Sequence, residues 1–368
     1  MDKTNGLFFE LIRISFGKLD AFSSNPSPED WKRLYALALK QTLIGFCFSG
    51  IERLPAEQRP PRELLMQWYG MTRQIEERNR VMDERTAETT RYFRSHGFKT
   101  AILKGQGIAQ LYPQPERRQS GDVDIWLYST REMIYEFARA HDPEGKLHGV
   151  NYHHIHYDLF EDTEVEVHIY PGYLHNPFAN ARLHKFFDTY PPREEETPSA
   201  AFNRIFILLH IYNHFIGHGV GLRQVMDYYY VLRNPDEDSI SATIEWLKKL
   251  GLMRFASATM WVLQEVFGLE EEYLIVAPNE KEGRFLLEEI CHTGNMGHYE
   301  RRHWGSLETP VGRFLYNLRR DSHFISHYPK EVCWQPLFSI WVNVRKYFWN
   351  RTPKARDIDE LQNLNTDM

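Results

Sequence analysis

Apolar residues recur at helical spacing along most of the chain. Residues 1–90 and 200–350 carry this period, and one long helical segment runs from about Arg62 to His96. Ser27 and Pro28 predict a helix start, because a serine hydroxyl caps free N–H groups and proline suits the first turn. The pattern therefore predicts a mostly helical protein.

Strand-like positions gather in the middle of the chain. Short apolar runs at 99–103 and 122–127 predict two strands, and residues 131–141 predict a helix. The alternating runs 154–160 and 164–169 flank a short polar turn, which is typical of an antiparallel hairpin. The fold class expected is α+β, with a small mixed sheet between two helical blocks.

Four regions follow from this layout. They are an N-terminal helical region at 1–90, an α+β core at 91–190, a C-terminal helical domain at 191–350 and a polar, frayed tail at 351–368.

The composition is that of an ordinary globular protein. The 368 residues are 42% hydrophobic and 26% charged, with a net charge of −6, so no overall basic field attracts nucleic acid. Cys47, Cys291 and Cys333 form no CxxC pair, which argues against a disulfide framework and a cysteine zinc site. The longest apolar stretch, 205–216, is too short to span a bilayer, and we expect a cytoplasmic protein with no membrane partner.

Three carboxylates stand in strand-like surroundings. Asp122 and Asp124 are two residues apart, so both side chains project from one strand face. Glu166 lies between two valines in a later strand and presents a third carboxylate. Such a set suits Mg²⁺ and can hold two ions for an in-line phosphoryl displacement. The plainer interpretation is a solvated strand face.

A glycine turn follows the first predicted strand. The run Lys104-Gly105-Gln106-Gly107 leads into a helix expected to open at 108–111. Backbone N–H groups at a helix start can bind phosphate, and Lys104 can reach a phosphate as a mobile charge. Lys104 can equally be a polar strand end.

Together these motifs resemble the DNA polymerase β-type nucleotidyltransferase superfamily. A bacterial family called "uncharacterised nucleotidyltransferase" is more similar still, over about residues 30–340 and most specifically over 103–127. The motifs that carry this resemblance are Leu103-Lys104-Gly105, Leu111-Tyr112-Pro113, Arg118, Gly121-Asp122-Val123-Asp124, Glu166-Val167-His168, Gly221 to Asp227 and Gly294 to Gly297.

The resemblance implies a nucleotidyltransferase fold with its active site on the open face of the sheet. It implies that Mg²⁺, with Mn²⁺ as an alternative, binds the catalytic carboxylates Asp122, Asp124 and Glu166. It implies an NTP donor held by Lys104, Gly105, Gln106, Gly107, Arg118 and Gly121. The superfamily turn is usually Gly-Gly or Gly-Ser, and its third acid is more often Asp. Glu164 and His168 share the strand face of Glu166 and are alternatives for completing the site.

Histidines recur at i, i+4 on a later predicted helix. His210, His214 and His218 can line one face. In zinc hydrolases a Glu follows the first histidine of such a motif, and here that position is Ile211. A half-buried structural face is the plainer interpretation. Alternatively, residues of these helices wall the active-site cleft together with a strand histidine. The candidates for that wall are His168, His210, His214, Arg223 and Asp227, and the last two can also form an ion pair.

Further histidines lie on the predicted hairpin. His154 and His156 share a face and can be accessory ligands or bases, or simply exposed residues. They motivate a weaker hypothesis, a metal hydrolase.

We therefore expect transfer of an NMP from an NTP to a hydroxyl, with release of pyrophosphate. The acceptor can be a small molecule, a sugar, a protein or an RNA end. The alternative hypothesis is a non-catalytic nucleotide-binding or protein-interaction module on the same fold, motivated by the unusual Gly105-Gln106 turn.

Overall fold

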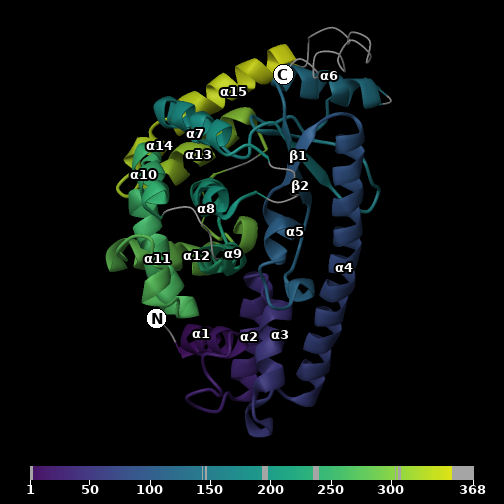
Figure 1. Ribbon diagram of the computed structural model, residues 1–368. Coiled ribbons are helices and arrows are strands. Elements are labelled where there is room, and N and C mark those ends of the chain that lie inside the picture. The colour runs from purple at the N-terminus through teal and green to yellow at the C-terminus, as the bar shows by residue number, and fades with distance from the viewer. Residues whose placement is uncertain are drawn as a thin grey trace. The chain divides into compact units, whose positions relative to one another are not determined.

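A computed structural model shows the protein to be mostly helical with one four-stranded mixed sheet, which confirms the α+β class (Figure 1). The structure describes residues 3–142, 144–145, 147–192, 198–234, 240–302, 304–305 and 308–349. The predicted tail at 351–368 and part of the segment 191–199 lie outside these residues.

The chain forms two compact units, each assembled from separate stretches of sequence. The first comprises residues up to 81, 108–120 and 207–302, and the second comprises 82–107, 121–206 and the described residues after 302. Helices α4 (Arg62–Ser95) and α8 (Ala200–Gly217) contribute to both. The division at 90, 190 and 350 stays a prediction.

The first unit is helical. Besides parts of α4 and α8 it contains α1 (Lys3–Ser15), α2 (Pro28–Lys40), α3 (Ile44–Arg53), α9 (Leu222–Arg233), α10 (Ile240–Leu250), α11 (Met253–Phe267) and α12 (Glu280–Thr293), with short 3-10 turns η1 (Ala56–Gln58), η2 (Pro115–Arg117), η3 (Glu271–Tyr273) and η4 (Asn295–Gly297). The predicted start of α2 is confirmed, since the Ser27 side chain accepts a hydrogen bond from the Asp30 N–H. Trp31 and Trp68 are fully buried and meet edge to face.

The second unit carries the sheet. Its strands are β1 (Lys99–Ile102), β2 (Val123–Tyr128), β3 (His154–His156) and β4 (Val165–His168), and its helices include α5 (Lys104–Ala109) at its border, α6 (Arg131–His141), α7 (Pro177–Thr189), α13 (Pro310–Phe324), α14 (Pro329–Val332) and α15 (Gln335–Trp349). The strand order is β1-β2-β4-β3. The central strands β2 and β4 are parallel, and the other two strand pairs of this sheet are antiparallel.

The pairing register aligns the polar residues in two rows. In one row Asp124 of β2 stands opposite Glu166 of β4, which stands opposite His156 of β3. In the next row His168 of β4 pairs with His154 of β3. The predicted hairpin is thus confirmed, with strands shorter than the alternating runs suggest.

The other face of the sheet packs against helices. Val123, Ile125 and Leu127 of β2 are almost completely buried in one cluster with apolar residues of α4 and α6. This alternation along β2 is what the sequence predicts, with carboxylates on one face and core residues on the other.

Two elements near the site differ in their ends from the prediction. Strand β2 begins at Val123, so Asp122 precedes it. Helix α5 begins at Lys104 and ends at Ala109, earlier than expected, and Gly105 within it has φ +47° and ψ −122°. A side chain would be strained at this φ, so the turn requires a glycine here.

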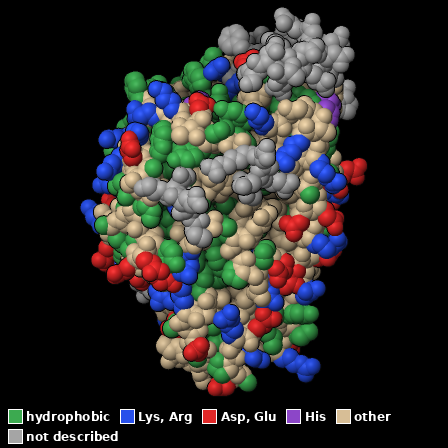
Figure 2. All heavy atoms as spheres, viewed as in Figure 1, with side chains coloured by type: hydrophobic (Ala, Val, Ile, Leu, Met, Phe, Trp, Pro, Cys, Tyr) green, Lys and Arg blue, Asp and Glu red, His purple; other side chains and the backbone are tan. Residues whose placement is uncertain are grey.

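None of the described helices is long and apolar enough to cross a membrane. On the face in view, acidic and basic side chains of the described residues are interspersed (Figure 2).

Gly107 and Gly121 differ in packing, and this generates a stability prediction. A Cβ on Gly107 would lie 2.8 Å from the backbone oxygen of Ile102, whereas a Cβ on Gly121 would meet nothing within 4 Å. Gly107→Ala should therefore lower the free energy of unfolding by about 1–3 kcal/mol, the usual cost of overpacking. Gly121→Ala, the matched control, should be neutral or slightly stabilising. Chemical denaturation measures both, and equal stability of the two variants would contradict the packing role of Gly107.

Candidate functional site

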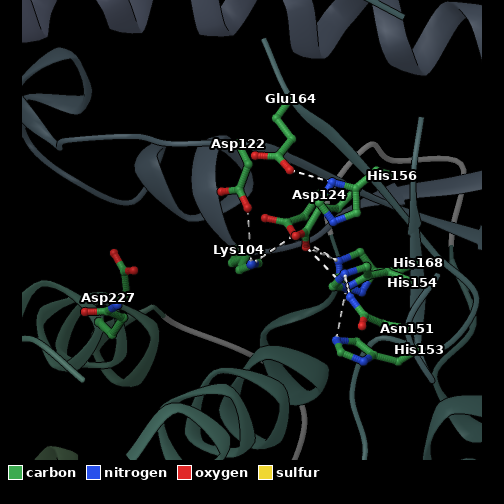
Figure 3. Close-up of polar contacts among 12 residues, drawn as sticks. Lys104, Asp122, Asp124, Asn151, His153, His154, His156, Glu164, His168 and Asp227 are labelled. Carbon is green, nitrogen blue, oxygen red and sulfur yellow. Dashed lines mark hydrogen bonds and ion pairs between the residues drawn. The ribbon is translucent and has the colours of Figure 1, made fainter. Parts of the chain in front are cut away.

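Asp124 is the centre of the polar face. Its side chain is 0% exposed, and Oδ1 accepts a hydrogen bond from Lys104 Nζ at 2.9 Å. Lys104 Nζ also lies 3.8 Å from Oδ2 of Asp122, whose side chain is 36% exposed. Figure 3 shows Lys104 reaching both carboxylates from the turn that follows β1. One ammonium group therefore neutralises part of the charge of two carboxylates.

His168 supplies a second positive partner. Its Nε2 lies 2.9 Å from Asp124 Oδ1 and 3.4 Å from Glu166 Oε2. Nδ1 of His154 also lies 3.4 Å from the same Glu166 oxygen, while Asn151 donates to Nε2 of that ring at 2.6 Å. Three strands thus bring two carboxylates and two imidazoles together.

Charge and burial shift the pKa values of these groups in opposite directions. Burial alone would lower the pKa of His168, but hydrogen bonds to Asp124 and Glu166 outweigh it and raise that pKa to about 9. Burial and the neighbouring His168 lower the pKa of His154 to about 4. Burial opposes ionisation of Glu166, yet His168 and Lys104 hold its pKa well below the ordinary value.

Lys104 stays protonated although it is half-buried. Burial would lower its pKa, but the charges of Asp122, Asp124 and Glu166 raise that pKa above its ordinary value. At neutral pH Lys104 is therefore an ammonium, His168 an imidazolium and Glu166 a carboxylate, while His154 is neutral.

Glu164 is separated from this group. It precedes β4, its side chain is 56% exposed, and it pairs with Nδ1 of His156. Three residues were alternatives for completing the site. Of these, Glu166 and His168 lie near Asp124, and Glu164 does not.

Gln106 and Gly107 have packing contacts in the glycine turn. The buried Gln106 side chain donates from Nε2 to Asp83 of α4. Gly107 lies against the backbone of Ile102 at the end of β1. Their assignment to nucleotide binding, like that of Gly105 and Gly121, stays a prediction.

Arg118 belongs to the first unit and is fully buried. Its Nε and Nη2 donate to the two carboxylate oxygens of Asp227 at 2.7 and 2.9 Å, and the Tyr112 hydroxyl donates to the same carboxylate at 2.6 Å. The Asn79 amide donates to the Arg118 carbonyl at 2.7 Å. This bidentate pair joins the residue that follows η2 to α9 inside the first unit.

The remaining candidates for a pocket wall also lie in the first unit. The His210 and His214 rings are 4.4 Å apart on α8, which confirms their shared face, whereas His218 lies beyond the end of that helix. Arg223 donates to the Thr42 hydroxyl and the Gln119 carbonyl. Their role as a pocket wall stays a prediction, because the structure brings together Lys104, Asp122, Asp124, Glu166 and His168 in the second unit.

The residues fit a divalent cation. Asp124, Glu166 and His168 offer ligand atoms within 4.8 Å of one another, as do His154, His156 and Glu166, and also His153, His154 and His168. Asp124 Oδ2 is buried and has no hydrogen-bond partner among the residues that the structure describes. A buried carboxylate oxygen without a partner is costly, and a cation removes that cost.

Comparison with known proteins is consistent with this geometry. The family described as uncharacterised nucleotidyltransferase matches residues 27–268, which is most of the chain. The chain belongs to this family. The resemblance inferred from the motifs is thereby confirmed, and membership supports a role in nucleotidyl transfer. Neither the curated proteins nor the solved structures gave a match.

Sequence reasoning missed three contacts of these residues. The bond between His168 and Asp124 depends on the alignment of β2 with β4, which the sequence alone does not specify. The partners Asp83 of Gln106 and Tyr112 of Asp227 lie 23 and 115 residues away from them. The motif Glu166-Val167-His168 was a usable signal, because both side chains project from one strand face.

The two neighbouring histidines should titrate at opposite ends of the pH range. NMR of histidine-labelled protein should give a midpoint near pH 9 for His168 and near pH 4 for His154. Because the folded pKa of His168 exceeds its ordinary value of 6.5, its contribution to stability is complete below pH 6.5 and is lost as pH rises through about 9. Two midpoints near 6.5 would contradict the charge arrangement.

The buried ion pair of the first unit should carry much of that unit's stability. Asp227→Ala leaves the Arg118 guanidinium buried without its carboxylate, so the free energy of unfolding should fall by about 3–5 kcal/mol. Glu245→Ala, which removes an exposed ion pair with Lys249 on α10, should change it little. Urea denaturation measures both, and an equally small effect of Asp227→Ala would argue against a structural role.

Proposed function

We propose that this protein is a divalent-metal-dependent nucleotidyltransferase that moves an NMP from an NTP to an acceptor hydroxyl. The acceptor oxygen attacks the α-phosphorus, the bond from that phosphorus to the bridging oxygen breaks, and pyrophosphate leaves. The observation that carries the proposal is that Lys104 lies against Asp122 and Asp124, and that Asp124 pairs with Glu166 across two adjacent strands, in a chain that belongs to a nucleotidyltransferase family.

Asp122, Asp124 and Glu166 are the side chains that would hold Mg²⁺, or Mn²⁺ in its place. Asp124 is buried and accepts hydrogen bonds that hold it in place, whereas Asp122 is partly exposed and accessible to a ligand from solvent. When bound, the ion supplies positive charge to the phosphate oxygens and to the attacking hydroxyl.

Lys104 would bind the donor phosphates. It follows β1 directly, and its ammonium already lies between two carboxylates. A flexible lysine can follow a phosphate as a point charge, while Gly105 gives the turn the backbone conformation that keeps Lys104 in place. Arg118 is the weaker candidate for this role, because Asp227 accepts two hydrogen bonds from its guanidinium.

Glu166 would receive the proton of the acceptor hydroxyl. It is the half-buried member of the pair Asp124 and Glu166, and its carboxylate stays ionised at neutral pH. Holding the acceptor close to the α-phosphate supplies the rest of the rate enhancement, since phosphoryl-type transfer depends mainly on position and charge. The candidate acceptors are small molecules, sugars, protein side chains and RNA ends.

A non-catalytic nucleotide-binding module is the competing proposal. The Gln106 side chain favours it, because this residue donates to Asp83 and leaves the turn without a hydroxyl for the triphosphate. Binding of a nucleotide without any release of pyrophosphate would then be expected.

Asp122 is the most informative residue to change. Its exposure should allow Asp122→Asn to fold normally, while pyrophosphate release should fall by at least about 100-fold, as for other fixed electrostatic groups. Asp158→Asn removes an exposed carboxylate of the same unit and should keep full activity. The assay follows pyrophosphate with ATP, GTP, CTP and UTP, each with and without Mg²⁺ or Mn²⁺.

The two proposals separate in the same experiment. Full activity of Asp122→Asn would refute the carboxylate mechanism. Stabilisation of the wild type by a nucleotide, unaffected by metal and without turnover, would support the non-catalytic module.

A further inference from the structure

We propose that a cavity of the second unit, lined by residues of α6, α7 and α15, binds a small organic acid with a flat, apolar body. The volume of the cavity is about 740 Å³. Pockets for small molecules typically enclose about 300–1,000 Å³ and combine apolar walls with a few polar groups. This site goes beyond the proposed function, because it lies apart from the carboxylates that would carry nucleotidyl transfer.

Aromatic rings form much of the cavity wall. The Tyr170 ring stacks on His184 of α7, with centroids 4.2 Å apart. Phe338 and Trp341 of α15 lie 5.1 and 5.5 Å from the Tyr152 ring. All five side chains line the cavity, and Trp341 is 41% exposed, so a bound ligand would remove apolar surface from water. Such rings pack against the faces and edges of another flat ring, which favours a ligand with a flat apolar part.

Positive charge outweighs negative charge at this cavity. Among the described residues that line it, Arg131 and Arg345 stand against one carboxylate, that of Glu132. The buried Arg131 guanidinium lies 5.5 Å from the centroid of the Tyr152 ring. The exposed Arg345 guanidinium lies 4.9 Å from the Trp341 ring. Both cations are thus held beside the aromatic wall, where they favour an anionic ligand over a neutral or cationic one.

The beginning of α6 adds to the positive field. Ser129, Thr130, Arg131 and Glu132 line the cavity, and Thr130 is the residue that caps this helix. The N-terminal end of a helix carries a partial positive charge, which stabilises an anion nearby. Arginine binds a carboxylate through charge-assisted hydrogen bonds. Together with the aromatic wall, these groups point to an organic acid.

Hydrogen bonds hold part of the wall in place. The Asn180 amide donates to the Tyr152 hydroxyl at 2.9 Å, and its oxygen accepts from the Leu174 N–H at 2.9 Å. The same hydroxyl lies 3.3 Å from Nε2 of His184. Burial lowers the pKa of His184, so at neutral pH the ring is uncharged and can accept this bond. A wall fixed in this way loses little freedom when a ligand binds.

The cavity is separate from the carboxylate group of the same unit. Its described lining residues include neither Lys104 nor any of the three proposed metal ligands. The His153 ring lies 5.4 Å from His168 and 4.8 Å from Tyr173. Tyr173 is in turn parallel to Phe338 of the cavity wall, with centroids 5.4 Å apart. Two rings therefore connect the polar face of the sheet to the cavity, and a ligand there would leave the carboxylates open.

Three naphthalene probes test the proposal. They are naphthoate, naphthylmethanol and naphthylmethylammonium, each substituted at the same ring carbon, so they share one flat body and differ in charge. Isothermal titration calorimetry of the full-length protein, without nucleotide or metal, measures their dissociation constants. We expect naphthoate to bind at least about 10-fold more tightly than the alcohol, because hydrogen bonds between charged groups are the stronger ones. The ammonium probe should bind most weakly.

Ala181 provides a matched pair of variants. It is an exposed residue of α7 that lines the cavity, so Ala181→Glu and Ala181→Lys should both fold. Their new side chains are similar in length and opposite in charge. Naphthoate should bind Ala181→Glu roughly 3- to 10-fold more weakly than Ala181→Lys, and the ammonium probe should show the reverse order.

Two further variants separate the cavity from the general charge of the surface. Arg345→Gln removes an exposed cation of the wall and should weaken naphthoate binding by a similar factor. Lys185→Gln, the control, removes an exposed cation of α7 that does not line the cavity, and it should leave the affinity unchanged.

The opposite results would overturn the proposal. They are equal affinity for the three probes, no binding of naphthoate at millimolar concentration, or naphthoate binding that neither Ala181→Glu nor Arg345→Gln weakens. Because the titrations contain no nucleotide and no metal, their outcome does not depend on whether the protein releases pyrophosphate.

Discussion

A carboxylate buried in the middle of a sheet must have positive partners, and much of the second unit follows from this requirement. Removing a carboxylate from water costs several kcal/mol even after the protein relaxes. Asp124 pairs with Lys104, which follows β1, and with His168 of β4. These two strands flank β2 on its two sides. The pairing of β2 with both β1 and β4 thus brings one positively charged side chain to each side of Asp124.

The mixed sheet makes this arrangement possible. Because β2 and β4 run parallel, Asp124 and Glu166 come level with each other near the beginnings of their strands. Because β3 runs antiparallel to β4, its histidines His154 and His156 lie in the same two rows. The opposite face is a hydrophobic cluster that fixes the strands against α4 and α6, so the polar groups are held by packing that they do not themselves provide.

Local features of this protein could be predicted from its sequence, and distant contacts could not. The alternation around Asp124 correctly indicated one polar and one buried face of β2. The position of His168 depends on strand register, and the Arg118–Asp227 pair joins residues 109 positions apart. A period of two or 3.6 residues contains no information about such pairings. For the same reason, units assembled from separate stretches of chain do not follow from a pass along the sequence.

Lys104 links the structural requirement to the proposed chemistry. In the absence of ligands its ammonium compensates Asp124, so it cannot move to a phosphate without leaving a buried carboxylate undercompensated. A divalent ion beside Asp124 and Glu166 would take over that compensation and allow Lys104 to turn toward the donor. Metal binding and phosphate binding would then be coupled by charge, since each would make the other less costly. The buried carboxylate that organises the sheet would in this way also set the order in which the ligands of the reaction can bind.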